Sequence, residues 1–166
     1  LLGESLGEVT EYTLEPALST GGGIVSNIVN AGDTVYAVKD MRGAMVAAYV
    51  KGGLRVFQRV SFAGTATLGS ETLADTLAAA EHVTAMELTG VGIVDSAASA
   101  QALMQTLFDN AVYESASVGG GETRSLLIAL DNGLLMQLMV GDDTLSACGT
   151  WSCPEFFEAY DATVAQ

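Results

Sequence analysis

SLLIALDNGLLMQLMVGDDTLSACGTWSCPEFFEAY, from Ser125 to Tyr160, carries the strongest structural signals of this chain. Two apolar runs flank an Asp-Asn-Gly step at 131–133. An Asn-Gly step between such runs is typical of a β-hairpin, because a tight hairpin turn requires positive φ, which Asn and Gly adopt at low cost. The sequence therefore predicts strands at 125–130 and 134–140, joined by a short turn.

The same stretch ends in signals for a last strand pair and a terminal helix. Residues 144–147 and Trp151 are predicted to form the strands, and Pro154 suits the first position of a helix, where its missing N–H costs nothing. Three aromatic side chains would dock this helix on the core: Phe156, Phe157 and Tyr160.

Further strands are predicted upstream. Residues 34–39, 44–50 and 54–62 are β-rich runs separated by glycine-containing breaks, which predicts a three-stranded meander. Two weaker strands are expected at 8–14 and 24–29. Residues 83–94 return to strand, with a bulge or turn at Gly90 and Gly92, and 112–118 are expected at a sheet edge.

Two helices precede the terminal one. Ser70 is expected to cap a short helix over 70–80, and Ser96 a longer one ending at Asn110. In the longer helix the apolar residues share one face at helical spacing: Ala100, Leu103, Met104, Leu107 and Phe108. The order of elements predicts one α+β domain over 1–166, with a mostly antiparallel β-sheet of hairpins and a meander, and two or three helices packed on it.

Composition limits the classes of partner. The chain is 49% hydrophobic and 16% charged, with a formal net charge of -14. Such a surface repels phosphate backbones and anionic lipid heads, so nucleic-acid binding is disfavoured. No apolar run reaches the roughly 18 residues of a membrane span. The chain begins at Leu1 rather than Met, so a processed or trimmed part of a longer protein is expected.

The cations are clustered on the meander. Five of the six fall in one 21-residue window: Lys39, Arg42, Lys51, Arg55 and Arg59. Arg55, Phe57 and Arg59 project together from one strand face, and guanidinium groups beside an aromatic ring suit acidic or aromatic ligands. The predicted binding site consists of the five clustered cations and Phe57. The alternative is a solvated face whose arginines pair with the protein's own carboxylates.

Two cysteines, Cys148 and Cys153, bracket four residues that include a turn signal. This spacing can bring two cysteines to bonding distance, and we expect a disulfide, which would indicate an oxidising compartment. The alternative is a pair of buried, reduced thiols. With only His82 to join them, a zinc site would lack ligands, and no metal or cofactor is expected.

No catalytic set stands out. His82 follows an Ala-rich segment, no Gly-x-Ser-x-Gly elbow is present, and capping a helix C-terminus is the simpler role for this side chain. Asp142 and Asp143 follow Gly141 in ordinary turn chemistry, with weak divalent-cation binding as the alternative. The glycines at 119–121, with Glu122 and Arg124 nearby, are expected to form a linker loop and not an anion nest, because a strand follows them.

The segments 33–39, 44–57, 130–133 and 147–151, with Phe156, resemble extracytoplasmic domains of Gram-positive bacterial lipoproteins and membrane-anchored proteins. The resemblance implies an extracytoplasmic location and a tethered role, and it carries no catalytic residues. We therefore expect a non-catalytic binding or interaction module for an unknown protein or cell-surface ligand. The alternatives are a small carboxylate-dependent hydrolase or glycan-acting enzyme, and a purely structural spacer domain.

Overall fold

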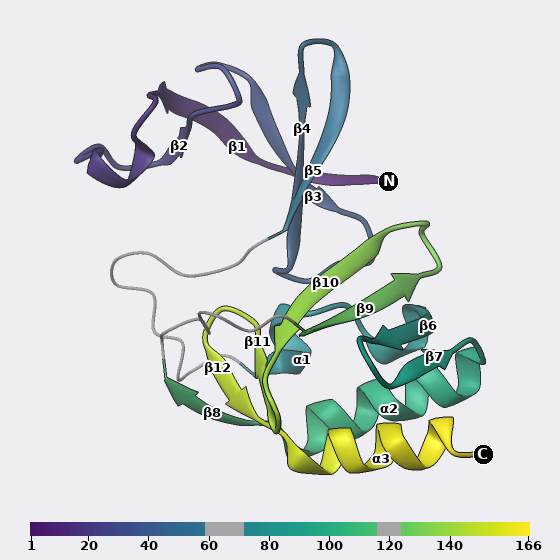
Figure 1. Cartoon of the computed structure of the whole chain (residues 1–166). Coiled ribbons are helices and arrows are strands. Elements are labelled where there is room, and N and C mark those ends of the chain that lie inside the picture. Colours follow the sequence, from purple (N-terminus) through teal and green to yellow (C-terminus); the bar gives the residue numbers. More distant parts are fainter. Residues whose placement is uncertain (59–71, 116–123) are drawn as a thin grey trace. The chain divides into compact units, whose positions relative to one another are not determined.

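The computed structural model describes residues 1–58, 72–115 and 124–166 (Figure 1). The contacts of the chain divide into two compact units, Leu1–Gln58 and Arg59–Gln166, and each is described by itself. The described residues form two mostly antiparallel sheets and three α-helices, so the predicted α+β class is confirmed, with the strands shared between two sheets. The expectation of one domain over 1–166 stays a prediction.

The N-terminal unit is a five-stranded sheet with the strand order β2-β1-β3-β4-β5. β1 and β2 pair in parallel, and the other neighbours are antiparallel. The predicted meander is confirmed as β3, β4 and β5; its last residues, including Arg59, lie outside the described part of the chain. The strands are β1 (Leu2–Tyr12), β2 (Ile24–Ser26), β3 (Thr34–Val38), β4 (Met45–Val50) and β5 (Gly53–Gln58).

A two-residue turn joins β4 to β5. Val50 pairs with Gly53, and the two residues between them have positive φ, 51° at Lys51 and 80° at Gly52. Positive φ at both central positions is the type I′ turn, whose twist matches that of the flanking strands. The turn therefore fixes the hairpin register and places Lys51 at its tip.

One buried cluster of this unit lies on one face of the sheet. Val9, Val29, Val35 and Ala48 are buried together there. Four partly buried side chains pack against them: Ile24, Val46, Val50 and Phe57. Register shifts between β1 and β3 bend the long first strand, since a bulge increases local twist.

The C-terminal unit contains a seven-stranded antiparallel sheet with the order β7-β6-β9-β10-β11-β12-β8. The predicted strand at 83–94 is a hairpin of two strands, with Gly90 in its turn and Gly92 at the start of the second strand. The predicted edge strand at 112–118 is confirmed as far as Ser115, beyond which the residues up to 123 are not described. The strands are β6 (Val83–Leu88), β7 (Gly92–Val94), β8 (Val112–Ser115), β9 (Arg124–Leu130), β10 (Leu135–Val140), β11 (Thr144–Ser146) and β12 (Thr150–Ser152).

The β9–β10 hairpin confirms the prediction from the Asp-Asn-Gly step, but its turn differs in detail. Leu130 N donates to Leu134 O at 2.9 Å and Gly133 N donates to Leu130 O at 3.1 Å. Only Gly133 has positive φ, 84°, so the loop is the three-residue type in which a left-handed glycine follows a type I turn. Asn132 contributes through its side chain, because its Oδ1 accepts from Leu134 N at 3.0 Å.

Two helices, α2 (Ala97–Asn110) and α3 (Pro154–Val164), run along the sheet of this unit (Figure 1). Ser96 caps α2 as predicted, since its hydroxyl accepts from Ser99 N. Four of the five predicted core residues of α2 are buried, and Phe108 is half-buried. The predicted aromatic residues of α3 are all buried: Phe156, Phe157 and Tyr160.

The helix expected at 70–80 is much shorter than predicted. α1 (Leu73–Thr76) has one turn, followed by a separate 3-10 turn at 80–82. Thr72 caps α1 in a reciprocal capping box with Asp75, and Ser70, the expected cap, lies outside the described residues. The helix ends because Leu77 adopts an extended conformation, with ψ at 177°.

The disulfide expected between Cys148 and Cys153 is not formed; both residues are buried thiols. Cys148 lies in the β11–β12 turn with φ of 53°, whereas Cys153 follows β12 at the base of the hairpin, where its N–H donates to Asp143 O. Three extended residues of β12 separate them, about 10 Å of strand, and a disulfide requires Cα atoms within about 6.8 Å. The cysteine pair therefore no longer supports an oxidising compartment.

Candidate binding site

Three of the predicted binding residues line one groove of the N-terminal unit. Lys51, Arg55 and Phe57 border a groove of about 410 Å³, which we call the basic groove. Arg55 lies opposite Ala48, and Phe57 is two residues further along the same strand face. The remaining walls come from β1, from the segment after β2 and from β4: Tyr12, Asn27, Ile28 and Val50.

The basic groove adjoins an apolar pocket of about 220 Å³ in the core of the same unit. Asn27, Ile28 and Phe57 line both spaces. Val9, Ile24 and other aliphatic side chains complete the pocket. Phe57 therefore borders both the charged groove and the apolar pocket. Its side chain is half-buried and not fully exposed to solvent.

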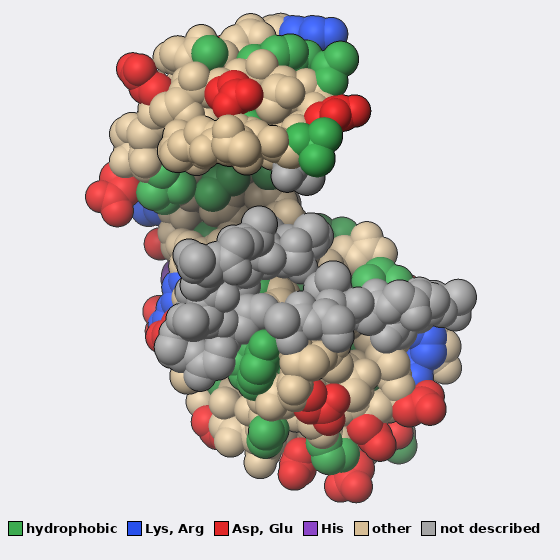
Figure 2. All heavy atoms as spheres, turned by 90° about the vertical axis from the view of Figure 1, so that its left-hand side faces the viewer, with side chains coloured by type: hydrophobic (Ala, Val, Ile, Leu, Met, Phe, Trp, Pro, Cys, Tyr) green, Lys and Arg blue, Asp and Glu red, His purple; other side chains and the backbone are tan. Residues whose placement is uncertain are grey.

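The described residues supply no partner for the two cations of the basic groove. Its lining contains Lys51 and Arg55 but no carboxylate. Within the described ranges neither cation forms an ion pair or a side-chain hydrogen bond. Figure 2 shows a basic side chain at the top of this unit, where the tip of the β4–β5 hairpin lies, with hydrophobic side chains on the same face.

The other predicted cations lie elsewhere. Lys39 and Arg42 are exposed in the connection from β3 to β4, at the end of the sheet opposite the β4–β5 turn. The six residues of β4 separate the two ends by about 20 Å. The predicted cationic face therefore divides into two groups, and Arg59 lies outside the described residues.

Sequence reasoning missed four residues of the basic groove: Val50, next to Lys51, and three residues outside the meander. Tyr12 ends β1, and Asn27 and Ile28 follow β2, so both segments reach the groove only through the parallel β1–β2 pairing. Parallel pairing between segments joined by a loop leaves no local sequence signal. The one available hint in the sequence is the apolar pair Ile28-Val29 between Asn27 and Asn30; the structure leaves Ile28 50% exposed.

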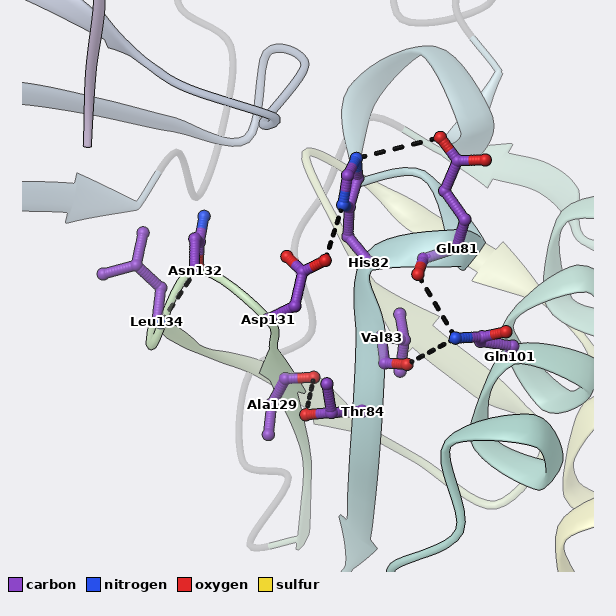
Figure 3. Close-up of polar contacts among 9 residues, drawn as sticks. All are labelled: Glu81, His82, Val83, Thr84, Gln101, Ala129, Asp131, Asn132 and Leu134. Carbon is purple, nitrogen blue, oxygen red and sulfur yellow. Dashed lines mark hydrogen bonds and ion pairs between the residues drawn. The ribbon is translucent and has the colours of Figure 1, made fainter.

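His82 belongs to a polar cluster in the C-terminal unit (Figure 3). It ends the 3-10 turn, and its Nδ1 lies 3.0 Å from Asp131 Oδ2, in the turn of the β9–β10 hairpin. Its Nε2 lies 3.8 Å from Glu81 Oε1. Gln101 of α2 donates to the carbonyl oxygens of Glu81 and Val83, each at 3.2 Å.

This cluster connects three elements and differs from a nucleophilic triad. In a triad one ring nitrogen of the histidine faces the nucleophile, whereas both nitrogens of His82 face carboxylates. The main chain repeats the same connection, because Asp131 N donates to His82 O at 2.8 Å. The arrangement therefore suits a clamp that holds the hairpin turn against the 3-10 turn.

Among the described residues, no two carboxylates converge in the same one of these cavities: the basic groove, the apolar pocket and two further clefts. Four cavities bordered by described residues are the basic groove, the apolar pocket, a cleft beside Asp33 and a cleft beside Glu87, and at most one carboxylate lines each of them. A glycosidase-type reaction requires two carboxyl groups across one cleft. Across the residues that the structure covers, no group of three or more His, Cys, Asp or Glu is placed to hold a metal ion.

The remaining candidates occupy ordinary structural positions. Asp142 and Asp143 lie in the turn from β10 to β11, closed by Gly141 N donating to Thr144 O at 2.9 Å. Arg124 begins β9, and its Nε donates to Thr89 O at 3.4 Å. The glycines at 119–121 and Glu122 lie outside the described residues.

Comparison with protein-family models, with curated proteins and with solved structures finds no match to this chain. The resemblance to Gram-positive extracytoplasmic domains therefore stays a prediction. In the described part of the chain, no helix combines the length and the apolar character needed to cross a membrane.

Proposed function

We propose that this chain is a non-catalytic binding module whose basic groove holds an acidic segment of a partner protein, with an apolar side chain of that segment in the adjoining pocket. The observation that carries the proposal is that two cations without an ion pair among the described residues, Lys51 and Arg55, lie beside the apolar ring of Phe57. A charged rim around an apolar recess is the usual composition of a site that both orients and retains its ligand.

Each part of the basic groove has a distinct task in this proposal. The guanidinium of Arg55 can bind a carboxylate through two parallel hydrogen bonds, and Lys51 supplies a point charge at the rim. Phe57, Tyr12 and Ile28 remove apolar surface of the ligand from water, which retains it once it has docked. In this proposal the two cations select an acidic ligand, and the apolar contacts determine how long the ligand stays bound.

The rest of the molecule shapes the kind of partner. The chain has a net charge of -14, and Figure 2 shows acidic side chains spread over the face of the C-terminal unit that it presents. A uniformly acidic partner would be repelled by most of this surface, so a partner of mixed charge, with a local acidic segment, fits better. The proposal includes the extracytoplasmic, tethered location, which the sequence resemblance alone supports.

A labelled peptide tests this proposal. The probe is a fluorescein-labelled decapeptide in which Asp and Glu flank a central Phe, and binding to the full chain is measured by fluorescence anisotropy. We expect the double variant Arg55→Gln, Lys51→Gln to weaken binding at least about tenfold, a loss of about 1.4 kcal/mol. The difference in peptide affinity between the wild type and the double variant should become smaller as the salt concentration rises, because salt screens exposed charges.

Arg42→Gln is the matched control, since it removes one exposed cation of the same unit outside the basic groove. We expect it to leave peptide affinity unchanged. A double variant that binds as tightly as the wild type, or an equal loss in Arg42→Gln, would show that the basic groove is not the binding site.

A further inference from the structure

A second cleft lies on the opposite face of the same strands. Side chains alternate along a strand, so Tyr36 and Tyr49 point away from the face that carries Val35 and Ala48. They border a polar cleft of about 470 Å³, which we call the tyrosine cleft. Its other polar side chains come from the turn before β3, from β3 and from the β4–β5 turn: Asn30, Asp33, Thr34 and Lys51.

The two rings lie beside each other on neighbouring strands. Tyr36 pairs with Ala47, and Tyr49 is two residues beyond Ala47 on β4, which makes the tyrosines diagonal neighbours on one face. Such neighbours are about 7–8 Å apart, within reach of aromatic side chains. Tyr49 is 51% exposed and Tyr36 is half-buried, so the pair forms an aromatic platform with one open ring.

The polar groups of the tyrosine cleft are available to a ligand. The side chains of Asn30, Asp33 and Thr34 form no hydrogen bond or ion pair within the described residues, and the same holds for both tyrosine hydroxyls and for Lys51. The set contains donors, acceptors and groups that do both. Asp33 and Lys51 have opposite charges, so the lining has no net formal charge.

The walls of the tyrosine cleft are held by backbone geometry. On one side is the type I′ turn at Lys51 and Gly52. On the other, Asp33 N donates to Asn30 O at 3.1 Å and Gly32 N donates to Val9 O at 2.8 Å, with φ of 89° at Gly32. Two hydrogen-bonded turns therefore lie on either side of the tyrosine rings and fix the shape of the cleft in the absence of ligand. Because the site is preformed, less conformational entropy is lost on binding.

We propose that the tyrosine cleft binds a neutral saccharide. Sugar rings have apolar C–H faces that pack on aromatic rings, and hydroxyl groups that donate and accept hydrogen bonds at once. The tyrosine cleft provides both kinds of contact. Its two tyrosine rings can pack on the C–H faces, and its amide, carboxylate, hydroxyl and ammonium groups can hydrogen-bond the sugar hydroxyls. The lining has no net formal charge, so it does not favour a charged ligand. This proposal goes beyond the binding of a protein segment and does not rest on it, because the two sites share only Lys51 at their borders.

The test is an NMR titration of the full, isotope-labelled chain with maltotriose, cellotriose and chitotriose, each to about 10 mM, a range that detects millimolar affinity. We expect at least one trisaccharide to shift amide signals of β3, β4 and the 30–33 turn. Tyr49→Ala should weaken that binding at least about tenfold, since ring stacking is lost. Tyr12→Ala, which removes an exposed tyrosine of the basic groove, should leave it unchanged.

Two further variants separate the contributions. Tyr49→Phe should keep most of the affinity, because the ring remains, and Asp33→Asn should reduce it while the spectrum stays that of a folded chain. Arg55→Gln should weaken only the acidic peptide, so failure of one site is distinguishable from failure of the other. No shift with any of the three sugars, or shifts that survive Tyr49→Ala, would overturn the proposal.

Discussion

Replacing Tyr160 by Phe should destabilise the C-terminal unit by about 1–3 kcal/mol, the usual cost of leaving a buried polar group unsatisfied. The Tyr160 hydroxyl accepts from Leu88 N at 3.1 Å and lies 2.8 Å from Gly92 O and 3.1 Å from Met86 O. Both Tyr160 and Leu88 are essentially inaccessible. The variant keeps the ring and its packing, so the predicted loss comes from the hydrogen bonds alone.

Urea unfolding followed by the fluorescence of Trp151, which belongs to the same unit, measures this loss. Tyr12→Phe is the control, because that side chain is exposed and forms no hydrogen bond within the described residues. Its unfolding free energy should differ from that of the wild type by no more than about 0.5 kcal/mol.

Burial also raises the pKa of Tyr160 above its ordinary value of 10.0. The stability that the neutral hydroxyl contributes is therefore complete below about pH 10 and is lost as pH rises further. The unfolding free energies of the wild type and of Tyr160→Phe should converge above that pH. A loss below about 0.5 kcal/mol at neutral pH would refute this reasoning.

Three other outcomes are expected in the C-terminal unit. Leu107→Ala should lower the free energy of unfolding by about 2–5 kcal/mol, because this fully buried side chain of α2 leaves a cavity; a change below about 0.5 kcal/mol would place it outside the core. Cys148 and Cys153 should resist alkylation by iodoacetamide in the native protein, and both should be alkylated in urea without a reductant. Mass spectrometry measures the alkylation. A pair that stays non-alkylated in urea would indicate a disulfide. Burial, followed by nearby carboxylates, raises the pKa of Cys153 from 9.0 to about 12, so the stability it contributes is complete below pH 9 and is lost between pH 9 and 12. Unfolding free energy should therefore fall more steeply above pH 9 in the wild type than in Cys153→Ala, and parallel curves would contradict the assignment.

Local signals predicted the elements with strong periodicity or turn chemistry. The hairpin around Gly133 follows from the need for one residue with positive φ, and α2 follows from its cap at Ser96 and its apolar face. The aromatic residues of α3 are buried as expected. Each of these features depends on residues within a few positions of one another, which is the range over which a sequence pattern carries information.

Features that depend on distant contacts were predicted less well. The helix expected at 70–80 has one turn, and the strand signals of the first 32 residues did not reveal that β2 pairs in parallel with β1. The disulfide prediction counted the residues between Cys148 and Cys153 correctly but assumed a turn where β12 is extended. A short spacing brings two side chains together only if the intervening backbone bends.

The candidate site shows the same limit. Alternation along β5 placed Arg55 and Phe57 on one face, as the structure has them. Clustering in sequence did not place Lys39 and Arg42 there, because a six-residue strand separates the two ends of the meander. Tyr12 and Ile28 enter the basic groove only through the folding of β1 and β2.

A double-mutant cycle between Arg55 and the acidic residues of the labelled peptide tests the central claim most directly. Arg55→Gln, a peptide with one carboxylate replaced by an amide, and the combination of both changes give the coupling free energy of that pair. The basic groove predicts a coupling of at least about 1 kcal/mol with one acidic position of the peptide. Additive effects at every acidic position would show that Arg55 does not contact the bound segment, and would contradict the proposed binding site.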